Sequence, residues 1–286
     1  MQFVFAGGSK RSGTTLLHSI LCSTQATPPP AAEDGTVRYL ALAYEDTLRR
    51  FDRHASFFFE DRDKAHRIYR QMTLRYLHEI AGRWPEASHL VIKQPQLTRH
   101  FPTLAKLLPR ARFVITVRDP RDTVASLAKV ARREHEQQAR PGHRTMGIPG
   151  LVRMVAQDYQ EVLNVFGARN SNRVMWVRYE DMVRAPETTA QRLGDFTGID
   201  LSGYQSGEPW RGWADGTVNL EERRKSPFFS PLWGQAVTDT RVGTWPEVLD
   251  AKQEATVTRA LAPIMRAFGY GDVPAAGGST TTQGQE

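Results

Sequence analysis

The sequence predicts an α/β fold in three layers, with a central parallel β-sheet covered by helices on both faces. The first observation is a set of short apolar runs, rich in β-branched and aromatic residues, that are typical of buried parallel strands. These runs are Phe3–Ala6, Leu90–Ile92, Phe113–Val117 and Val174–Val177. The second observation is that helical patterns separate the runs, which predicts right-handed βαβ units. The third is the length of 286 residues, which is enough to bury one large core.

The helical segments are those in which apolar residues recur every three or four positions. In such a fold, ligands bind at the carboxyl ends of the strands. The predicted helices are Thr14–Leu21, Val37–Phe51, Ala65–Ile80, Leu97–Leu108, Val124–Arg133, Leu151–Phe166, Thr188–Phe196 and Glu247–Phe268.

No internal repeat or linker interrupts this pattern, so we expect a single domain over residues 1–273. Residues 274–286 are rich in Gly, Ser, Thr and Gln, and we expect a disordered tail there. Residues 134–150 are expected to form a surface loop. A longer segment, residues 202–244, carries aromatic residues among Gly, Pro and charges. Two interpretations of this segment stay open: a functional lid, or a loop that its aromatic side chains attach to the surface.

The composition favours a protein that binds an anion. Lys and Arg number 38 against 31 Asp and Glu, which gives a net charge of +7. That excess suits a nucleotide, an acidic peptide or nucleic acid, but no zinc-finger spacing or RNA-binding aromatic signature supports nucleic acid. Cys22 is the only cysteine, which excludes an intramolecular disulfide and predicts a buried, inert thiol. No apolar run is long enough for a membrane span or a signal peptide, so the expected location is cytoplasmic.

A phosphate-binding loop follows the first predicted strand. The segment Gly7-Gly8-Ser9-Lys10-Arg11-Ser12-Gly13-Thr14-Thr15 opens a helix. Glycines allow a tight turn that points backbone N–H groups inward, and the helix N-terminus adds partial positive charge. The glycine spacing matches a Walker A loop, but Thr14 stands where the ATP-binding lysine belongs. The positive charge lies instead within the loop, at Lys10 and Arg11, which argues against a kinase or GTPase.

A second anion site is predicted where the strand Phe113–Val117 ends. Arg118 ends this strand, and Ser126 lies about one turn into the helix that follows. Asp119 or Asp122 can cap that helix, and Pro120 suits its first turn. Arginine offers a bidentate fork to a phosphate and serine a single hydroxyl donor. Two separate anion sites at one sheet edge fit one ligand that carries two phosphates.

These segments resemble the sulfotransferase family. GGSKRSGTTLLHSIL is similar to that family's 5′-phosphosulfate loop, and RFVITVRDPRDTVASLAK is similar to its 3′-phosphate segment. VRYEDMVRAPETTAQRLGDFTGI and RVGTWPEVL resemble two later elements, the second with a Trp that closes over the adenosine. The resemblance implies a P-loop NTPase-like sulfotransferase fold and a co-substrate, 3′-phosphoadenosine 5′-phosphosulfate (PAPS), with no metal. By position, the nucleotide-binding residues are Lys10, Arg11, Ser12, Gly13, Thr14, Thr15, Arg118, Ser126, Tyr179 and Arg241.

The same resemblance suggests the catalytic groups. Sulfuryl transfer needs cations at the leaving and equatorial oxygens, and a base for the acceptor hydroxyl. Arg11 is one such cation, and Lys93, in a K-x-P segment at a strand end, matches a second. The opening of the chain resembles the tyrosylprotein sulfotransferase branch, which implies Glu33 as the base, with Asp34 as the alternative. Ser226 or Ser230 matches a serine that related enzymes place near the sulfuryl.

The chain departs from that branch at two places, and several functions stay open. Lys10 replaces the usual proline, and AAEDGTVR only partly matches the motif around the glutamate. The expected acceptor is a tyrosine in a peptide with acidic residues nearby. The alternatives are a small-molecule, carbohydrate or lipid acceptor, a non-catalytic nucleotide-binding module and, least favoured, a P-loop kinase. The sequence does not determine the oligomeric state.

Overall fold

A computed structural model describes residues 1–30, 33, 35–137, 143–212 and 219–271 of the chain. Within that part, four parallel strands form one sheet with the order β2-β1-β3-β4. The strands are β1 (Gln2–Gly8), β2 (His89–Lys93), β3 (Arg112–Val117) and β4 (Val174–Arg178). The four strands predicted from the sequence are therefore confirmed.

The strand order creates a switch point between β1 and β3. After β1 the chain crosses to β2 on one side, and after β2 it passes over β1 to β3 on the other side. The carboxyl ends of β1 and β3 lie side by side, with Gly8 opposite Thr116 in the register. In open parallel sheets, ligands bind in the crevice at such a switch point. Both predicted anion sites follow these two strands.

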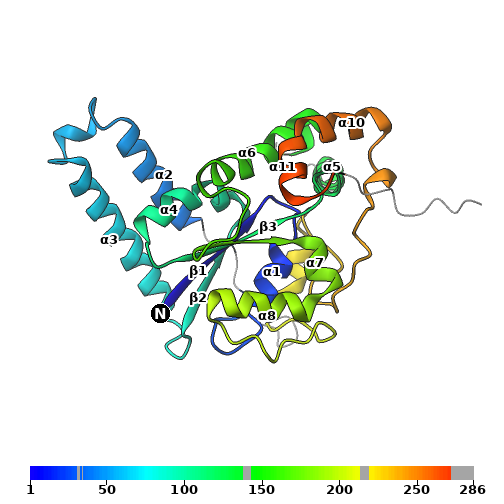
Figure 1. Cartoon of the computed structure of the whole chain (residues 1–286), viewed down its shortest axis with the longest axis horizontal. Coiled ribbons are helices and arrows are strands. Elements are labelled where there is room, and N and C mark those ends of the chain that lie inside the picture. The colour runs from blue at the N-terminus through cyan, green and yellow to red at the C-terminus, as the bar shows by residue number, and fades with distance from the viewer. Residues whose placement is uncertain (31–32, 34, 138–142, 213–218, 272–286) are drawn as a thin grey trace, which may run out of the picture.

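Helices cover both faces of the sheet, as Figure 1 shows. One apolar core joins the strands to α1, α7 and α8, and the other joins them to α2–α6, α10 and α11. The first group is α1 (Thr14–Leu21), α7 (Tyr179–Arg184) and α8 (Pro186–Thr197). The second group is α2 (Thr36–Arg49), α3 (Arg62–Ala81), α4 (Phe101–Leu107), α5 (Pro120–Glu136), α6 (Ile148–Phe166), α10 (Ala251–Ala260) and α11 (Ala262–Phe268). The predicted three-layer, P-loop NTPase-like architecture is confirmed.

Prolines account for two differences from the predicted helices. The segment expected as one helix from Leu97 to Leu108 is a 3₁₀ helix, η2 (Pro95–His100), followed by α4, which has Pro102 in its first turn. The last predicted helix is likewise divided into α10 and α11 at Leu261, before Pro263. Proline lacks a backbone N–H and clashes with the preceding turn, but it suits the first turn of a new helix.

Two segments expected as loops contain secondary structure. The predicted loop 134–150 is shorter than expected, because α5 continues to Glu136 and a 3₁₀ helix, η3 (His143–Thr145), lies against it. The buried His143 hydrogen-bonds Glu134 through Nδ1 at 3.0 Å. The predicted long loop of residues 202–244, called the late segment below, contains a short helix, α9 (Leu220–Arg224). Two further 3₁₀ turns are η1 (Ala55–Phe57) and η4 (Trp245–Glu247).

The remaining predictions concern Cys22, membrane-spanning segments and the domain boundaries. Cys22 is buried as predicted, and burial raises the pKa of its thiol to about 12. Within the described ranges, no helix is both long and apolar enough to cross a membrane. The single domain over residues 1–273 stays a prediction, and the predicted tail 274–286 lies outside the described residues.

We predict that Gly8→Ala destabilises the protein strongly. Gly8 has a φ of +136°, and a Cβ there would lie 2.2 Å from Thr116 Oγ1 and 2.6 Å from its carbonyl oxygen. The free energy of unfolding should fall by at least about 2 kcal/mol, measured by urea denaturation. Gly203→Ala is the matched control, because nothing lies within 4 Å of a Cβ built there. Equal stability of the two variants would contradict the prediction.

Candidate active site

The loop between β1 and α1 is held in an unusual conformation. Gly8 and Gly13 have φ values of +136° and +99°, and Arg11, at +70°, is the sole non-glycine residue of the described chain with a positive φ. Only glycine adopts such angles without strain, so the loop needs external support to keep Arg11 there. Gly13 also leaves room for Tyr179, because a Cβ would lie 2.6 Å from that ring.

Hydrogen bonds from η2 and from α6 supply this support. The backbone N–H of Gly8 donates to Thr98 Oγ1 at 2.7 Å, and that of Ser9 donates to the Tyr159 hydroxyl at 3.0 Å. The Ser9 hydroxyl donates to the buried carboxylate of Asp158 at 2.9 Å. Ser12 is completely buried, and its hydroxyl donates to the Ser9 carbonyl at 2.7 Å. Ser12 therefore shapes the loop from inside.

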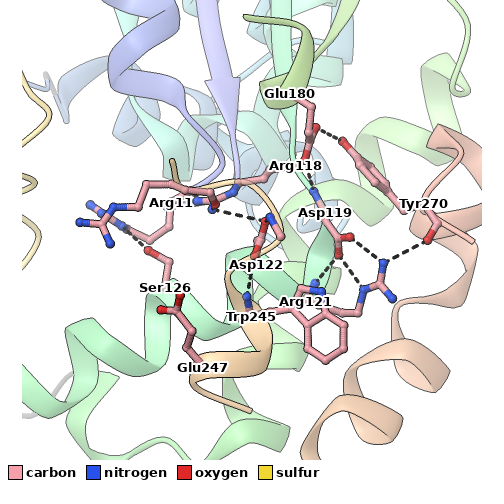
Figure 2. A network of polar contacts seen from close by, with 12 residues as sticks. Arg11, Arg118, Asp119, Arg121, Asp122, Ser126, Glu180, Trp245, Glu247 and Tyr270 are labelled. Atoms are coloured by element: carbon pink, nitrogen blue, oxygen red, sulfur yellow. Dashed lines mark hydrogen bonds and ion pairs between the residues drawn. The ribbon is translucent and has the colours of Figure 1, made fainter. Parts of the chain in front are cut away.

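The second predicted site lies at the end of β3 and the start of α5 (Figure 2). Asp119 is the N-cap of α5, and its carboxylate accepts hydrogen bonds from the backbone N–H and the guanidinium of Arg121. Its own N–H donates to Glu180, which also accepts from the Tyr270 hydroxyl. This buried network fixes the turn that carries Arg118.

Arg118 is 8% exposed and contacts four parts of the chain. Its guanidinium lies 4.6 Å from the centre of the Tyr179 ring and 3.5 Å from the Asp122 carboxylate. It also donates to the backbone carbonyls of Arg11 and Arg241. Arg118 thus joins the loop between β1 and α1, called the glycine loop below, to the segment that contains Arg241.

Asp122 connects α5 to the segment that contains Arg241 (Figure 2). Its two carboxylate oxygens accept hydrogen bonds from the backbone N–H groups of Gly243, at 2.7 Å, and Trp245, at 2.9 Å. Burial raises the pKa of Asp122, while Arg118 and the two backbone N–H groups oppose that shift. The centre of the Trp245 ring lies 5.0 Å from the Arg121 guanidinium. That this Trp closes over the adenosine, as the resemblance implies, stays a prediction.

A cavity of about 470 Å³ lies between these elements, and most of the predicted nucleotide-binding residues line it. Arg11 and Arg118 lie on the same cavity, so the two predicted anion sites meet. Lys10 and Ser12 are not among the lining residues. The predicted residues in the lining are Arg11, Gly13, Thr14, Thr15, Arg118, Ser126, Tyr179 and Arg241.

Arg11 lines this cationic cavity, and its guanidinium donates two hydrogen bonds. Its Nε donates to Ser126 Oγ at 3.0 Å, and its Nη1 donates to the Phe228 carbonyl at 2.6 Å. Burial, together with the nearby positive charges of Arg118 and Arg133, lowers the pKa of Arg11 to about 10. The cluster of positive charges therefore favours an anionic ligand.

Several residues that line the cavity were not predicted from the sequence. Three basic residues of α5, Lys129, Arg132 and Arg133, share its lining with Ser126. Arg133 donates to the Phe229 carbonyl at 2.8 Å, and burial lowers its pKa. The spacing of three and seven residues from Ser126 places Lys129 and Arg133 on one helical face, a signal that could have identified them. Three aromatic residues of the late segment also line the cavity: Trp210, Phe229 and Trp233.

The predicted catalytic lysine and glutamate meet outside this lining. Lys93 Nζ lies 2.7 Å from Glu33 Oε1, and the two side chains are 4% and 45% exposed. Burial lowers the pKa of Lys93, and Glu33 partly opposes the shift. The alternative base, Asp34, lies outside the described residues. Of the two candidate serines, Ser230 lines the cavity, while Ser226 accepts a hydrogen bond from the Phe228 N–H at 3.2 Å.

The side chains of the described residues also show whether a metal ion could bind. In the described ranges, no group of three or more His, Cys, Asp or Glu side chains could hold a metal ion. The cavity lining has two carboxylates, Asp122 and Glu136, against six Lys and Arg side chains. Such a lining suits an anion far better than a cation.

Together, the switch-point sheet, the glycine loop and the cationic cavity define a P-loop-like α/β protein whose cavity suits an anionic ligand. The profile of the sulfotransferase family matches residues 3–203. The chain belongs to the sulfotransferase family. By family and fold, it is a sulfotransferase.

Individual relatives agree with this assignment. The chain is 24% identical over 203 residues to a Caenorhabditis briggsae protein named "Putative protein-tyrosine sulfotransferase", covering 70% of this chain and 67% of that one. Its fold is similar to a sulfotransferase domain from the curacin biosynthetic pathway, with a TM-score of 0.59 and 15% identity over 96% and 99% of the two chains. The fold is also similar to a sulfotransferase domain from the Synechococcus PCC 7002 olefin synthase, with a TM-score of 0.58 and 15% identity over 96% of each chain.

We predict that Asp122→Ala loosens the segment around Gly243. Two backbone N–H groups lose their carboxylate partner, which should lower the free energy of unfolding by about 2 kcal/mol. Hydrogen exchange at the amides of Gly243 and Trp245 should accelerate at least about tenfold, as followed by NMR. Asp195→Ala removes an exposed carboxylate from α8 and serves as the control. Unchanged exchange at both amides would show that Asp122 does not hold the segment.

Proposed function

We propose that this protein transfers a sulfuryl group from PAPS to a hydroxyl acceptor. The observation that carries the proposal is the single cavity of about 470 Å³ that both Arg11 and Arg118 line. The two arginines come from the ends of neighbouring strands, β1 and β3. Such a cavity suits one ligand that has an anionic group at each end. An aromatic base of that ligand would lie between the aromatic side chains of the cavity.

The assignment of the ligand's two ends follows from the elements. The 5′-phosphosulfate binds the glycine loop, where Thr14 and Thr15 begin α1 and the helix N-terminus favours an anion. The 3′-phosphate binds Arg118 and Ser126 at the start of α5. Arg241 lies near that end, because Arg118 donates to its carbonyl. Tyr179 and the aromatic residues of the late segment surround the adenosine.

The reaction is an in-line transfer. The acceptor oxygen attacks sulfur, the bond from sulfur to the bridging oxygen of the phosphosulfate breaks, and 3′-phosphoadenosine 5′-phosphate (PAP) leaves with the electron pair. Arg11 stabilises the charge that develops on the leaving oxygen. Glu33 takes the proton of the acceptor hydroxyl. Its contact with Lys93 keeps the carboxylate in place, and its partial exposure leaves it accessible to an acceptor.

The acceptor we favour is a tyrosine in a peptide with acidic residues nearby. The name of the Caenorhabditis briggsae relative supports it, and a net charge of +7 suits an acidic peptide. A small molecule, carbohydrate or lipid with a hydroxyl is the second candidate, since every residue proposed for PAPS serves it equally.

The donor assignment is tested by calorimetric titration with PAP. Wild-type protein should bind PAP, and Arg118→Ala and Arg11→Ala should each weaken binding about 10- to 100-fold, because each removes charge-assisted hydrogen bonds. Arg192→Ala, on the exposed face of α8, is the matched control and should bind like wild type. If wild-type protein fails to bind PAP, the proposal is wrong.

The acceptor is identified by incubation with radiolabelled PAPS. A tyrosine peptide flanked by Asp residues, its Phe counterpart and a carbohydrate panel are the probes. Label on the Tyr peptide alone supports the first candidate, and label on a carbohydrate supports the second. PAP binding without transfer to any probe would favour a non-catalytic module.

We predict that Glu33→Gln slows transfer without changing nucleotide binding. The amide cannot take the acceptor proton, so kcat should fall about 10²- to 10⁴-fold while the Kd for PAP stays within about twofold. Glu60→Gln, an exposed carboxylate just before α3, is the control. Turnover equal to wild type would remove Glu33 from the mechanism.

A further inference from the structure

Lys10 precedes the cavity residue Arg11 in the chain but is not part of the cavity lining. Its ammonium contacts the ring of Phe228. The Lys10 ammonium lies 5.0 Å from the centre of the Phe228 ring. The carbonyl of the same Phe228 accepts the hydrogen bond from Arg11 Nη1 at 2.6 Å. The cations of two consecutive loop residues therefore contact opposite ends of one residue. Lys10 lies on the ring side of Phe228, and Arg11 lies on its backbone side.

The carboxylates that influence Lys10 each have a direct partner of their own. Glu33, Asp158 and Glu134 all act to raise the pKa of Lys10, so they lie within electrostatic range, but burial outweighs them and lowers that pKa. Their direct contacts are Glu33 with Lys93 at 2.7 Å, Asp158 with Arg99 at 2.7 Å, and Glu134 with His143 at 3.0 Å.

Lys10 itself has no hydrogen bond or ion pair with any residue in the described part of the chain. A partly buried ammonium without a direct anion costs free energy, and the contact with the ring of Phe228 offsets only part of that cost. The three N–H donors of Lys10 are therefore available to a ligand anion.

The proposed reaction places one anion at this position. The sulfuryl group leaves the phosphate at Arg11 and moves toward the acceptor oxygen near Glu33. Lys10 is adjacent to Arg11 in the loop and within electrostatic range of Glu33. Lys93 is less available for this role, because its charge is paired with Glu33 at 2.7 Å.

We propose that Lys10 is a further catalytic residue, whose ammonium binds the non-bridging oxygens of the sulfuryl group during its transfer. This inference rests on the proposed function. As the bond from sulfur to the bridging oxygen breaks and the bond to the acceptor oxygen forms, Lys10 stays protonated and balances the charge of the sulfuryl oxygens. Phe228 holds the ammonium in place through its ring.

The test compares two ligands that differ only in the sulfuryl group. Calorimetry measures the Kd of PAPS and of PAP, without acceptor, for wild-type protein, Lys10→Met and Lys10→Arg. Lys10→Met should weaken PAPS binding about tenfold and PAP binding less than about twofold, because PAP lacks the contacted oxygens. Lys10→Arg keeps the charge and should restore most of the preference for PAPS.

Turnover provides a second measurement. With whichever probe accepts label, Lys10→Met should lower kcat about 10²-fold, since the interaction strengthens in the transition state. Lys106→Met removes an exposed lysine from α4, controls for net charge and should leave kcat unchanged. Thermal unfolding of Lys10→Met verifies that the variant is folded.

The outcomes separate the inference from the proposed function. If wild-type protein binds neither ligand, the proposed function fails. If it binds both and Lys10→Met changes neither the ratio of the two Kd values nor kcat, only the inference is wrong. A rise in KM for an Asp-flanked peptide, with an unchanged ratio of Kd values, would assign Lys10 to acceptor binding and would also overturn it.

Discussion

The site depends on the close approach of two parallel strands at their carboxyl ends. Gly8 lies opposite Thr116 in the register, and a side chain on Gly8 would collide with both the hydroxyl and the carbonyl of Thr116. Because Gly8 lacks a Cβ, the loop after β1 can turn over the end of β3. The loop then carries Arg11 toward Arg118, and the same register brings α1 and α5 to one edge of the sheet. The meeting of the two predicted anion sites therefore depends on the close approach of Gly8 to Thr116.

The cavity also concentrates positive charge, and other groups of the protein stabilise its guanidinium groups. Backbone carbonyls of the late segment provide part of that support, since Phe228, Phe229 and Arg241 accept hydrogen bonds from Arg11, Arg133 and Arg118 respectively. Carbonyl oxygens carry only partial negative charge, so an incoming phosphate forms stronger bonds with the same guanidinium groups. The late segment therefore borders the cavity, and both interpretations of it, a functional lid or a loop attached to the surface by its aromatic side chains, stay open.

Charged groups divide into two regions on either side of the loop. On the side of α5, the cations line the cavity and face an open space of about 470 Å³. On the side of β2 and α6, Lys93 and Arg99 are paired with carboxylates at 2.7 Å, and Lys10 alone among these three lacks such a pair. The first region suits an anionic ligand, whereas the carboxylates of the second region lie in ion pairs with Lys93 and Arg99.

The sequence by itself determined the strands and most of the helices and led to predicted nucleotide-binding residues that mostly line one cavity, because apolar periodicity, glycine spacing and capping residues are local signals. Pro102 and Pro263 mark new helices at two places where apolar periodicity alone predicts one continuous helix. Only the tertiary structure decided which charges share a cavity, that Glu33 meets Lys93 across 60 residues, and that Lys10 contacts Phe228. These contacts join segments far apart in the chain. Their partners are chosen by strand order and packing, which no local pattern specifies.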